Sequence, residues 1–560
     1  MIDLRPHLTF LYGDEQATLL LARVERLFAD YRPRIMPRDG GLSERDSILI
    51  TYGDQVQSPN EKPLQTLKKF CDAHLTDVVS GIHILPFYPW TSDDGFSVVD
   101  HRRIDPALGE WDDVTSMQNF RLMFDGVINH ISSRSAWFQK FLQDDPRYRD
   151  YFIVVEGEPD LSQVVRPRAL PLLTPFQTPS GEKKVWTTFS ADQIDLNFKN
   201  PDVLLEILDI LLLYVERGAD FIRLDAIAYL WKEIGTACIH LPQTHCIIQF
   251  LRAALNEVAP HVHLITETNV PHADNISYFG DGTNEAQLVY NFALPPLTLH
   301  AFHTGDARIL SDWARKLTLP SDKTTFFNFL ASHDGIGLNP ARGILSAADI
   351  DSLIETTLDH GGLISYKHNA DGTQSPYEMN INYFDALSSP NGNEPLDLQI
   401  DRFLAAQAIM LSLVGVPGIY FHSLFSSRGW PEGVKLTGHN RTINRQKCQF
   451  DEVQNQLADK NSLRFRVFTR YRQLLKARSN ASAFHPHGTQ KVLDLHPCVF
   501  AIERVSPDGQ SRVLCLHNIG QTRISFLTKY ESAFDLFENQ NIQISNITLE
   551  SYQVQWLKLS

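Results

Sequence analysis

The chain has 560 residues, a formal net charge of -15, and 43% hydrophobic and 21% charged residues, a composition that is ordinary for a soluble globular protein. This length exceeds one simple core, so we expect several domains or one large domain with insertions. The acidic balance argues against binding to nucleic acid or to anionic membranes, because both need a basic surface.

Eight short apolar runs are predicted to be β-strands, and amphipathic segments such as 201–217 and 245–258 lie between most of them. The runs are nearly continuous in apolar residues, as expected for parallel strands that are covered on both faces. They are 47–53, 81–89, 122–130, 219–227, 263–270, 287–292, 326–334 and 416–423. Eight alternating β and α units predict an α/β fold of the (β/α)8 TIM barrel type.

Long connections and a change of pattern near the end suggest how the chain is divided. We assign 1–130 to the first part of the barrel and 131–200, which is rich in proline, to a domain inserted after strand three. Residues 201–487 form the rest of the barrel, and short alternating runs make 488–560 a small C-terminal all-β domain. Within the barrel, the turn-rich stretches 338–400 and 423–447 are predicted to be loop-rich and to carry substrate loops.

The cysteines and the N-terminus bear on the compartment. Six cysteines are scattered without a CxxC pair, which favours buried thiols in a reducing compartment over zinc or disulfides. The first residues lack the basic and apolar regions of a signal peptide, and the apolar run 203–215 is too short and too charged to span a bilayer. We expect a cytoplasmic protein that is a monomer or a homodimer and binds neither membranes nor nucleic acid.

Polar residues gather near the carboxyl ends of several predicted strands, where TIM barrels build their active sites. These residues are Asn129, His130, Asp225, Glu267, His333 and Asp334. Two carboxylates that flank one bond are the minimum for glycoside chemistry, since one attacks or stabilises the anomeric carbon and another protonates the leaving oxygen. Structural ion pairing is an equally good interpretation of these acids when the residues are considered alone.

Arg223 and Asp225 are two residues apart, so on a strand their side chains face the same side. An arginine beside a carboxylate favours its anionic form, which a nucleophile needs, whereas burial would help another acid to keep its proton. His130 and His333 could simply cap strand ends, which is the better interpretation without further information.

Four motifs, in order along the chain, resemble the signature regions of glycoside hydrolase family 13, the α-amylase superfamily. The motifs are INH at 128–130, FIRLDA at 221–226, ITET at 265–268 and SHD at 332–334, and the resemblance covers at least residues 47–447. It implies that Asp225 is the nucleophile, Glu267 the general acid/base and Asp334 a stabiliser of the transition state.

The same resemblance implies roles for the neighbours of these acids. Arg223 would orient Asp225, while His130 and His333 would hydrogen-bond the bound glucose. Asn129 matches a position that often ligates calcium in α-amylases, but AIAYLW after the nucleophile lacks the polar residues usual in calcium-binding members. We therefore expect no essential metal and no cofactor.

The sequence is more similar still to the sucrose phosphorylase subgroup. SDDGFSVVDH (92–101) resembles a loop that implies Asp93 and Phe96 in the glucose subsite, and VWTTFSADQIDLN (185–197) implies Phe189 and Gln193 there. Without the resemblance, Phe189 would be interpreted as ordinary core.

Two further segments, RPR (166–168) and NRTINR (440–445), resemble the subgroup's phosphate-side arginines. Guanidinium groups suit a phosphate co-substrate because they offer paired donors that stay charged. The residues implied are Arg166, Arg168 and Arg441 with the tyrosines Tyr229 and Tyr377 on the phosphate and acceptor side, and Arg445 among the substrate-binding residues.

The loop GTQSPYEMNINYFDAL (372–387) departs from sucrose phosphorylases, which carry an aspartate where this chain has Ser375. This loop, with LPLLTPFQ and FLASHDGIGLNP, resembles the branch that acts on glucosylglycerate or glucosylglycerol. A glycerate carboxylate would want a cation, and Arg428 and Lys435 are available in 423–447.

The resemblance thus implies a retaining α-glucoside phosphorylase that converts 2-O-α-glucosylglycerol or 2-O-α-glucosylglycerate, with inorganic phosphate as co-substrate, to α-glucose 1-phosphate. The sequence does not separate glycerol from glycerate. Sucrose or sucrose 6-phosphate phosphorylase and an α-glucoside hydrolase or transglucosylase are the alternatives. An inactive amylase-like binding subunit is a rival of another class, against which the intact set of Asp225, Glu267 and Asp334 argues.

Overall fold

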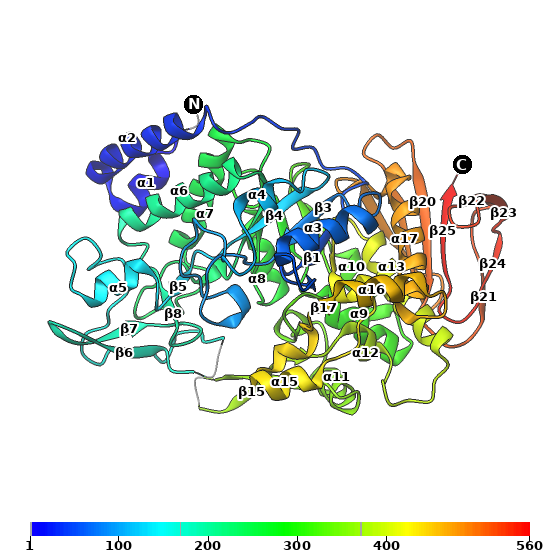
Figure 1. The fold of residues 1–560 in the computed structure, drawn as a ribbon. Helices are drawn as coiled ribbons and strands as arrows, with labels where there is room; N and C mark the ends of the chain where they lie inside the picture. Colours follow the sequence, from blue (N-terminus) through cyan, green and yellow to red (C-terminus); the bar gives the residue numbers. More distant parts are fainter. Residues whose placement is uncertain (1–2, 168–169, 370–371, 560) are drawn as a thin grey trace.

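The structure is a computed structural model that describes residues 3–167, 170–369 and 372–559. Eight parallel strands close into a barrel in the order β1-β16-β12-β11-β10-β9-β4-β3. They are β1 (Ile48–Thr51), β3 (Gly81–Ile84), β4 (Arg121–Gly126), β9 (Ala219–Leu224), β10 (His263–Thr266), β11 (Leu288–Tyr290), β12 (Thr325–Asn328) and β16 (Val416–Tyr420). Each overlaps one of the eight predicted runs, so the predicted (β/α)8 barrel is confirmed (Figure 1).

Helices surround this barrel, and most begin where the sequence supplies a start signal. The clearest is α6 (Pro201–Glu216), because the Asn200 side chain accepts the backbone N–H of Asp202 and proline occupies the first turn. Further helices are α3 (Pro63–His74), α4 (Trp111–Thr115), α7 (Pro242–Val258), α8 (His272–Ile276), α9 (Leu294–Thr304), α10 (Arg308–Arg315), α13 (Leu396–Ser412), α16 (Phe450–Ala458) and α17 (Leu463–Ser479). Among the described residues, no helix is long and apolar enough to cross a membrane.

Two helices precede the first barrel strand. α1 (Arg5–Tyr12) packs against α7, and α2 (Asp14–Tyr31) packs against α6. The Tyr31 hydroxyl donates to Asp209 Oδ1 at 2.9 Å and fixes α2 on the barrel's outer layer. Residues 1–130 were assigned to the barrel alone, so this helical pair is an addition to that assignment.

The segment between β4 and α6 forms small pieces of its own. It contains β5 (His130–Ser132), α5 (Ala136–Leu142), β6 (Leu173–Thr178), β7 (Gly181–Trp186) and β8 (Gln193–Asp195). β5 pairs with β8 beside the barrel, while β6 and β7 form an antiparallel hairpin that projects from it (Figure 1). The β5–β8 pair therefore carries the end of this segment back to the mouth of the barrel.

The stretch 338–400 is more regular than the predicted loop-rich insertion. It contains α11 (Ala347–Asp359), the antiparallel strands β14 (Leu363–His368) and β15 (Gln374–Asn380), and α12 (Tyr383–Leu387). Ser346 and Asp349 form a capping box at the start of α11, a signal that the turn-rich composition concealed. The stretch 423–447 holds the helices α15 (Pro431–Thr437) and η5 (Asn440–Asn444).

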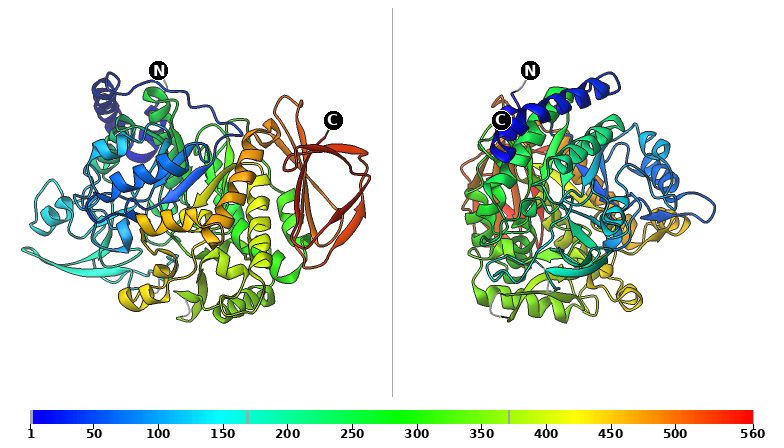
Figure 2. Two further views of the ribbon diagram at one scale, coloured as in Figure 1. Left: turned by 45° about the vertical axis from the view of Figure 1, so that its right-hand side comes forward. Right: turned by 90° about the vertical axis from the view of Figure 1, so that its left-hand side faces the viewer.

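The C-terminal region is all-β, as predicted. Its six-stranded antiparallel sheet has the order β18-β19-β20-β25-β22-β23, and β21 pairs with β24. The strands are β18 (Thr489–Leu493), β19 (Val499–Val505), β20 (Arg512–Asn518), β21 (Ile524–Leu527), β22 (Ser532–Asp535), β23 (Gln540–Gln543), β24 (Asn546–Leu549) and β25 (Val554–Leu559). The views of Figures 1 and 2 put this sheet on the opposite side of the barrel from the β6–β7 hairpin.

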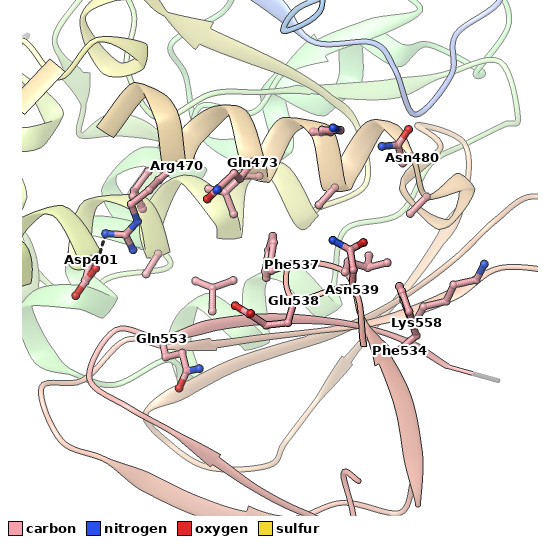
Figure 3. Close-up of a pocket in the computed structure, with 18 of the residues that line it drawn as sticks. Asp401, Arg470, Gln473, Asn480, Phe534, Phe537, Glu538, Asn539, Gln553 and Lys558 are labelled. Carbon is pink, nitrogen blue, oxygen red and sulfur yellow. Dashed lines mark hydrogen bonds and ion pairs between the residues drawn. The ribbon is translucent and has the colours of Figure 1, made fainter. Parts of the chain in front are cut away.

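A groove separates the C-terminal sheet from the barrel helices α13 and α17 (Figure 3). Its volume is ≈ 1160 Å³, and an ion pair of 2.7 Å between Arg470 and Asp401 lies on its α17 side. None of the described residues that line it was predicted to belong to the active site.

Candidate active site

The three acids that were predicted to be catalytic lie where the barrel strands end. β9 is buried along its whole length, and Asp225 follows it directly, with its backbone N–H donating to Gly126 O at 3.1 Å. Glu267 and Asp334 lie just beyond β10 and β12. Because parallel strands bring their carboxyl ends to one rim, the three acids meet in one cavity.

Arg223 is shared among several carboxylates. One guanidinium nitrogen of this 2% exposed side chain lies 2.5 Å from Asp125 Oδ1 and 2.8 Å from Asp225 Oδ1. The other lies 4.0 Å from Glu267 Oε2, which also accepts the backbone N–H of Ala226 at 3.0 Å. The pair formed by Arg223 and Asp225 therefore exists as expected, but Arg223 does not belong to Asp225 alone.

The surroundings divide the acids by pKa. Burial, with the charges of Asp225 and Asp334, raises the pKa of Glu267 to about 7 against the pull of Arg223. Burial also raises the pKa of Asp225, which Arg223 opposes only in part because Asp125 shares it. The pKa of Asp334 is held well below its usual range, since Arg441, His333 and Arg445 outweigh the effect of burial. Glu267 is thus the carboxyl that retains a proton near neutral pH.

Rings and amides enclose the space beside the acids. The rings of Phe96 and His333 stack with centroids 4.7 Å apart, and Phe189 lies 5.2 Å from the His130 ring. Gln193 Nε2 donates to Phe96 O at 3.2 Å and lies 3.2 Å from His130 Nε2. With Asp93, these predicted glucose-binding residues all line the cavity.

The predicted arginines do not all face this cavity. Arg445 lies behind it, where it donates to His333 O at 2.8 Å and to Asp94 Oδ2 at 2.9 Å. Arg441 lines the cavity and pairs at 2.5 Å with Asp334, while two of its nitrogens bind Glu378. Both arginines hold the carboxylates around them in place.

The other residues predicted for the phosphate and acceptor side are spread more widely. Tyr229, in η2 (Ile227–Tyr229), and Tyr377 of β15 line the cavity. Arg166 donates to Leu170 O within its own loop and is not among the cavity-lining residues, although Pro167 is. Arg168 lies outside the described residues.

Sequence analysis missed Asn269 and Glu378. Asn269 lines the cavity, and its Oδ1 is buried without a hydrogen-bond partner among the described residues. Its place, two residues beyond Glu267 at a strand end, was the available signal. Glu378 is 0% exposed and is visible only as the partner of Arg441, which no local pattern reveals.

The position that resembles a calcium ligand is already occupied by a cation of the chain itself. Lys232 Nζ donates to Asn129 Oδ1 at 2.8 Å and lies 2.6 Å from Asp195 Oδ2. An ammonium on these oxygens does not leave a donor set that fits a metal ion. Across the described residues, no group of three or more His, Cys, Asp or Glu side chains could hold one.

Neither of the cations that the sequence suggested for a glycerate carboxylate is among the described residues that line the cavity. Arg428 is bound to Asp385 at 2.6 Å and to Gln399 at 2.8 Å, and Lys435 is an exposed residue of α15. Lys367 of β14 pairs with Ser375 of β15, also outside the cavity lining, and no carboxylate among the described residues acts on it. Burial and the nearby Arg342 lower the pKa of Lys367.

The catalytic cavity is narrow, with a volume of ≈ 70 Å³, compared with ≈ 1160 Å³ for the groove beside the C-terminal sheet. Cavity volume alone would therefore indicate the groove as the candidate active site. The grouping of acids with separated pKa values instead makes the cavity at the barrel mouth the candidate active site.

Known proteins resemble this chain over most of its length. The profile of the family described as alpha amylase, catalytic domain, matches residues 76–336. A glucosylglycerate phosphorylase from Allomeiothermus silvanus is 54% identical over 514 residues, which cover 92% of this chain and 91% of that protein. A glucosylglycerate phosphorylase from Escherichia coli is 45% identical over 555 residues, 99% of each chain.

A solved structure agrees with the fold described here. It is that of sucrose 6F-phosphate phosphorylase from Thermoanaerobacter thermosaccharolyticum, with a TM-score of 0.74 and 25% identity. The alignment covers 90% of this chain and 98% of the other, so the similarity extends beyond the barrel.

Proposed function

The chain belongs to glycoside hydrolase family 13, the α-amylase superfamily, and on that premise we propose that it is a retaining phosphorylase of 2-O-α-glucosylglycerate. The observation that carries the proposal is the similarity, over nearly the full length, to two proteins named glucosylglycerate phosphorylase at 54% and 45% identity. The relative with a solved structure, named for sucrose 6F-phosphate, is only 25% identical. The sucrose-type alternatives therefore have weaker support.

The arrangement of the acids supports a double displacement. Asp225 attacks C1 of the glucosyl group while Glu267, whose pKa of about 7 keeps it protonated, delivers its proton to the departing glycerate oxygen. Phosphate then attacks C1 of the β-glucosyl-enzyme, and Glu267 accepts the phosphate proton as the C1–Asp225 bond breaks. Two inversions give α-glucose 1-phosphate with retention. Asp334, kept anionic by Arg441, stabilises the positive charge at the ring.

An anionic acceptor is supported by the hairpin of β14 and β15. Where sucrose phosphorylases have an aspartate, Ser375 leaves no carboxylate to repel a glycerate, and Lys367 stands opposite it without a counter-ion among the described residues. Tyr377, two residues beyond Ser375, lines the cavity. We therefore infer that glycerate, rather than glycerol, is the acceptor.

We extend the proposal to the surroundings of the reaction. Inorganic phosphate is the co-substrate, and we propose that neither a metal ion nor an organic cofactor takes part; at the position that resembles a calcium ligand, the Lys232 ammonium already binds Asn129 and Asp195. Dialysis against a metal chelator should leave the phosphorolysis rate and the unfolding temperature unchanged. The protein acts in the cytoplasm on small molecules, as a monomer or a homodimer.

The direct test uses the reverse reaction. The enzyme is incubated with α-glucose 1-phosphate and, in separate samples, with glycerate, glycerol, fructose or fructose 6-phosphate, and released phosphate is measured. We expect glycerate to give the fastest release. A preference for fructose or its phosphate would replace glycerate by a sucrose-type acceptor, and release that no acceptor accelerates over water would make the protein a hydrolase.

A further inference from the structure

The carboxylate of Asp192 accepts hydrogen bonds from hydroxyl groups in separate parts of the chain. Its Oδ2 accepts from Thr91 Oγ1 at 2.5 Å, Ser92 Oγ at 2.5 Å and Ser97 Oγ at 2.8 Å, and its Oδ1 accepts from Ser133 Oγ at 2.5 Å. Each oxygen of an ionised carboxylate has about two acceptor positions, so the three donors on Oδ2 occupy that oxygen fully. Among the described residues, the groups that act on the Asp192 carboxylate are these hydroxyls and not a cation.

Three of these donors belong to one short loop whose backbone is strained. Between Ser92 and Ser97, the residues Asp93, Asp94 and Gly95 have φ angles of 54°, 48° and 108°. Positive φ is costly for residues other than glycine and persists only where the surroundings impose it. Asp192 binds side chains on both sides of this strained turn.

The strained loop carries two residues of the glucose subsite. Asp93 lines the cavity, and Phe96 stacks on His333 while its carbonyl oxygen accepts from Gln193 Nε2 at 3.2 Å. Gln193 is the next residue after Asp192 in the chain. One carboxylate therefore fixes the loop that supplies one wall of the subsite and the strand that supplies another.

We propose that Asp192 is a positioning residue that assembles the glucose subsite before substrate arrives, by clamping the 91–97 loop against β8. It touches no reacting atom and acts through Asp93, Phe96 and Gln193. The proposal rests on the proposed function, because the subsite is taken to bind a glucosyl group. It predicts that Asp192 governs the affinity for glucose and not the choice of acceptor.

The protonation state of Asp192 fits this task. Burial would raise its pKa, but the hydroxyl donors of Ser133, Ser92, Thr91 and Ser97 outweigh burial and lower it. The carboxylate is thus ionised at neutral pH and accepts all four hydroxyls at once.

The test replaces Asp192 by alanine and by asparagine in the full-length enzyme. Misplacing a subsite by about 1 Å can cost about 10²-fold, so we expect Asp192→Ala to lower kcat/KM for α-glucose 1-phosphate by about 10- to 100-fold. Most of the loss should appear in KM, and the inhibition constant of free glucose should rise in parallel. Asp192→Asn should lose less, because its amide keeps one acceptor oxygen. The preference among acceptors should not change.

Asp144→Ala is the matched control. Asp144 lies in the same inserted segment and accepts from Ser180 N at 2.7 Å, Ser180 Oγ at 3.0 Å and Lys183 Nζ at 2.8 Å, yet it makes no contact with the 91–97 loop in the structure. It should leave KM for the glucosyl donor unchanged. If Asp192→Ala does not fold, Thr91→Val and Ser97→Ala remove the clamp from the other side and should raise the same KM.

An unchanged KM and glucose inhibition constant in all the clamp variants would overturn the proposal. So would equal losses in the Asp144→Ala control, or a loss confined to kcat that follows a lowered unfolding temperature. Failure of the proposed function would appear separately, in the wild-type protein, as acceptor-independent phosphate release. The clamp variants are then compared by their KM for hydrolysis of the same donor.

Discussion

Two buried cations organise this molecule in opposite ways. Where the inserted segment 131–200 adjoins the barrel, Lys232 forms an ion pair with one carboxylate, that of Asp195. Asp195 also accepts hydrogen bonds from Thr188 N and Thr188 Oγ1 at 2.7 Å each. At the catalytic centre, Arg223 is divided between Asp125, Asp225 and, more distantly, Glu267.

The difference lies in how fully each negative charge is balanced. Asp195 is well supplied with donors, and the Lys232 cluster joins the inserted segment to the barrel. Around Arg223 the acids exceed the cation, and burial together with the neighbouring carboxylates raises the pKa values of Asp225 and Glu267. Burial and this incomplete balance leave Glu267 able to give a proton near neutral pH, whereas Arg223 favours the anionic form that Asp225 would need as a nucleophile.

The largest expected effect comes from a substitution among the acids around Arg223. Asp225→Asn removes the proposed nucleophile, and kcat for phosphorolysis should fall by about 10⁴-fold or more. Because burial raises the pKa of Asp225, its charge is unfavourable in the folded state at neutral pH, and the variant should unfold at the same or a higher temperature. Retained turnover would remove Asp225 from the nucleophile role.

Removal of the buried cation Lys232 should, in contrast, lower the stability of the fold. Lys232→Met leaves the fully buried Asp195 charge without its cation, which should lower the free energy of unfolding by about 3–5 kcal/mol in denaturant titration. Lys199→Met is the control, because the Lys199–Glu233 pair has the same length class, 2.7 Å, but side chains 46% and 51% exposed. Its cost should be about 0–1 kcal/mol. Equal costs would mean that burial does not distinguish the two pairs.

The raised pKa of Glu267, near the shared Arg223, can be tested through the pH dependence of the reaction rate. Glu267 must be protonated to release glycerate, and its pKa is raised to about 7. Above that pH, kcat/KM for phosphorolysis should fall by about tenfold per unit as the proton is lost, whereas below it the rate is insensitive to this group. A limb near the ordinary glutamate pKa of about 4.5 would show that burial does not perturb Glu267.

The smallest expected effect concerns a third cation, Lys367, which has no carboxylate partner among the described residues. Lys367→Met should reduce kcat/KM for glycerate by about tenfold, the worth of one partly solvated ionic contact, and leave that for glycerol unchanged. Lys435→Met, at an exposed position of α15, should change neither value. Equal losses with both acceptors would give Lys367 a structural role.

The sequence predicted what depends on local pattern and missed what depends on partners. The eight barrel strands were found because parallel strands are apolar on both faces, and Asp225, Glu267 and Asp334 because strand ends converge. The apolar stretch AIAYLW was interpreted as lacking polar ligands, yet the next residue, Lys232, supplies the buried cation.

Other features were not predictable, because the contacts join distant segments. Asp192 reaches Thr91, 101 residues away, and Arg441 reaches Glu378 across 63 residues. No short motif encodes such pairs. Arg166 was expected at the phosphate, but its guanidinium donates to its own loop at Leu170, so a motif fixed the residue type and not the direction of the side chain.

The narrowness of the catalytic cavity, ≈ 70 Å³, has a kinetic consequence. Once glycerate has left, phosphate and water compete to attack C1 of the glucosyl-enzyme. Their relative rates decide how much of this intermediate is phosphorolysed and how much is hydrolysed. A small cavity holds few water molecules, which lowers the rate of hydrolysis and leaves more of the glucosyl-enzyme to react with phosphate.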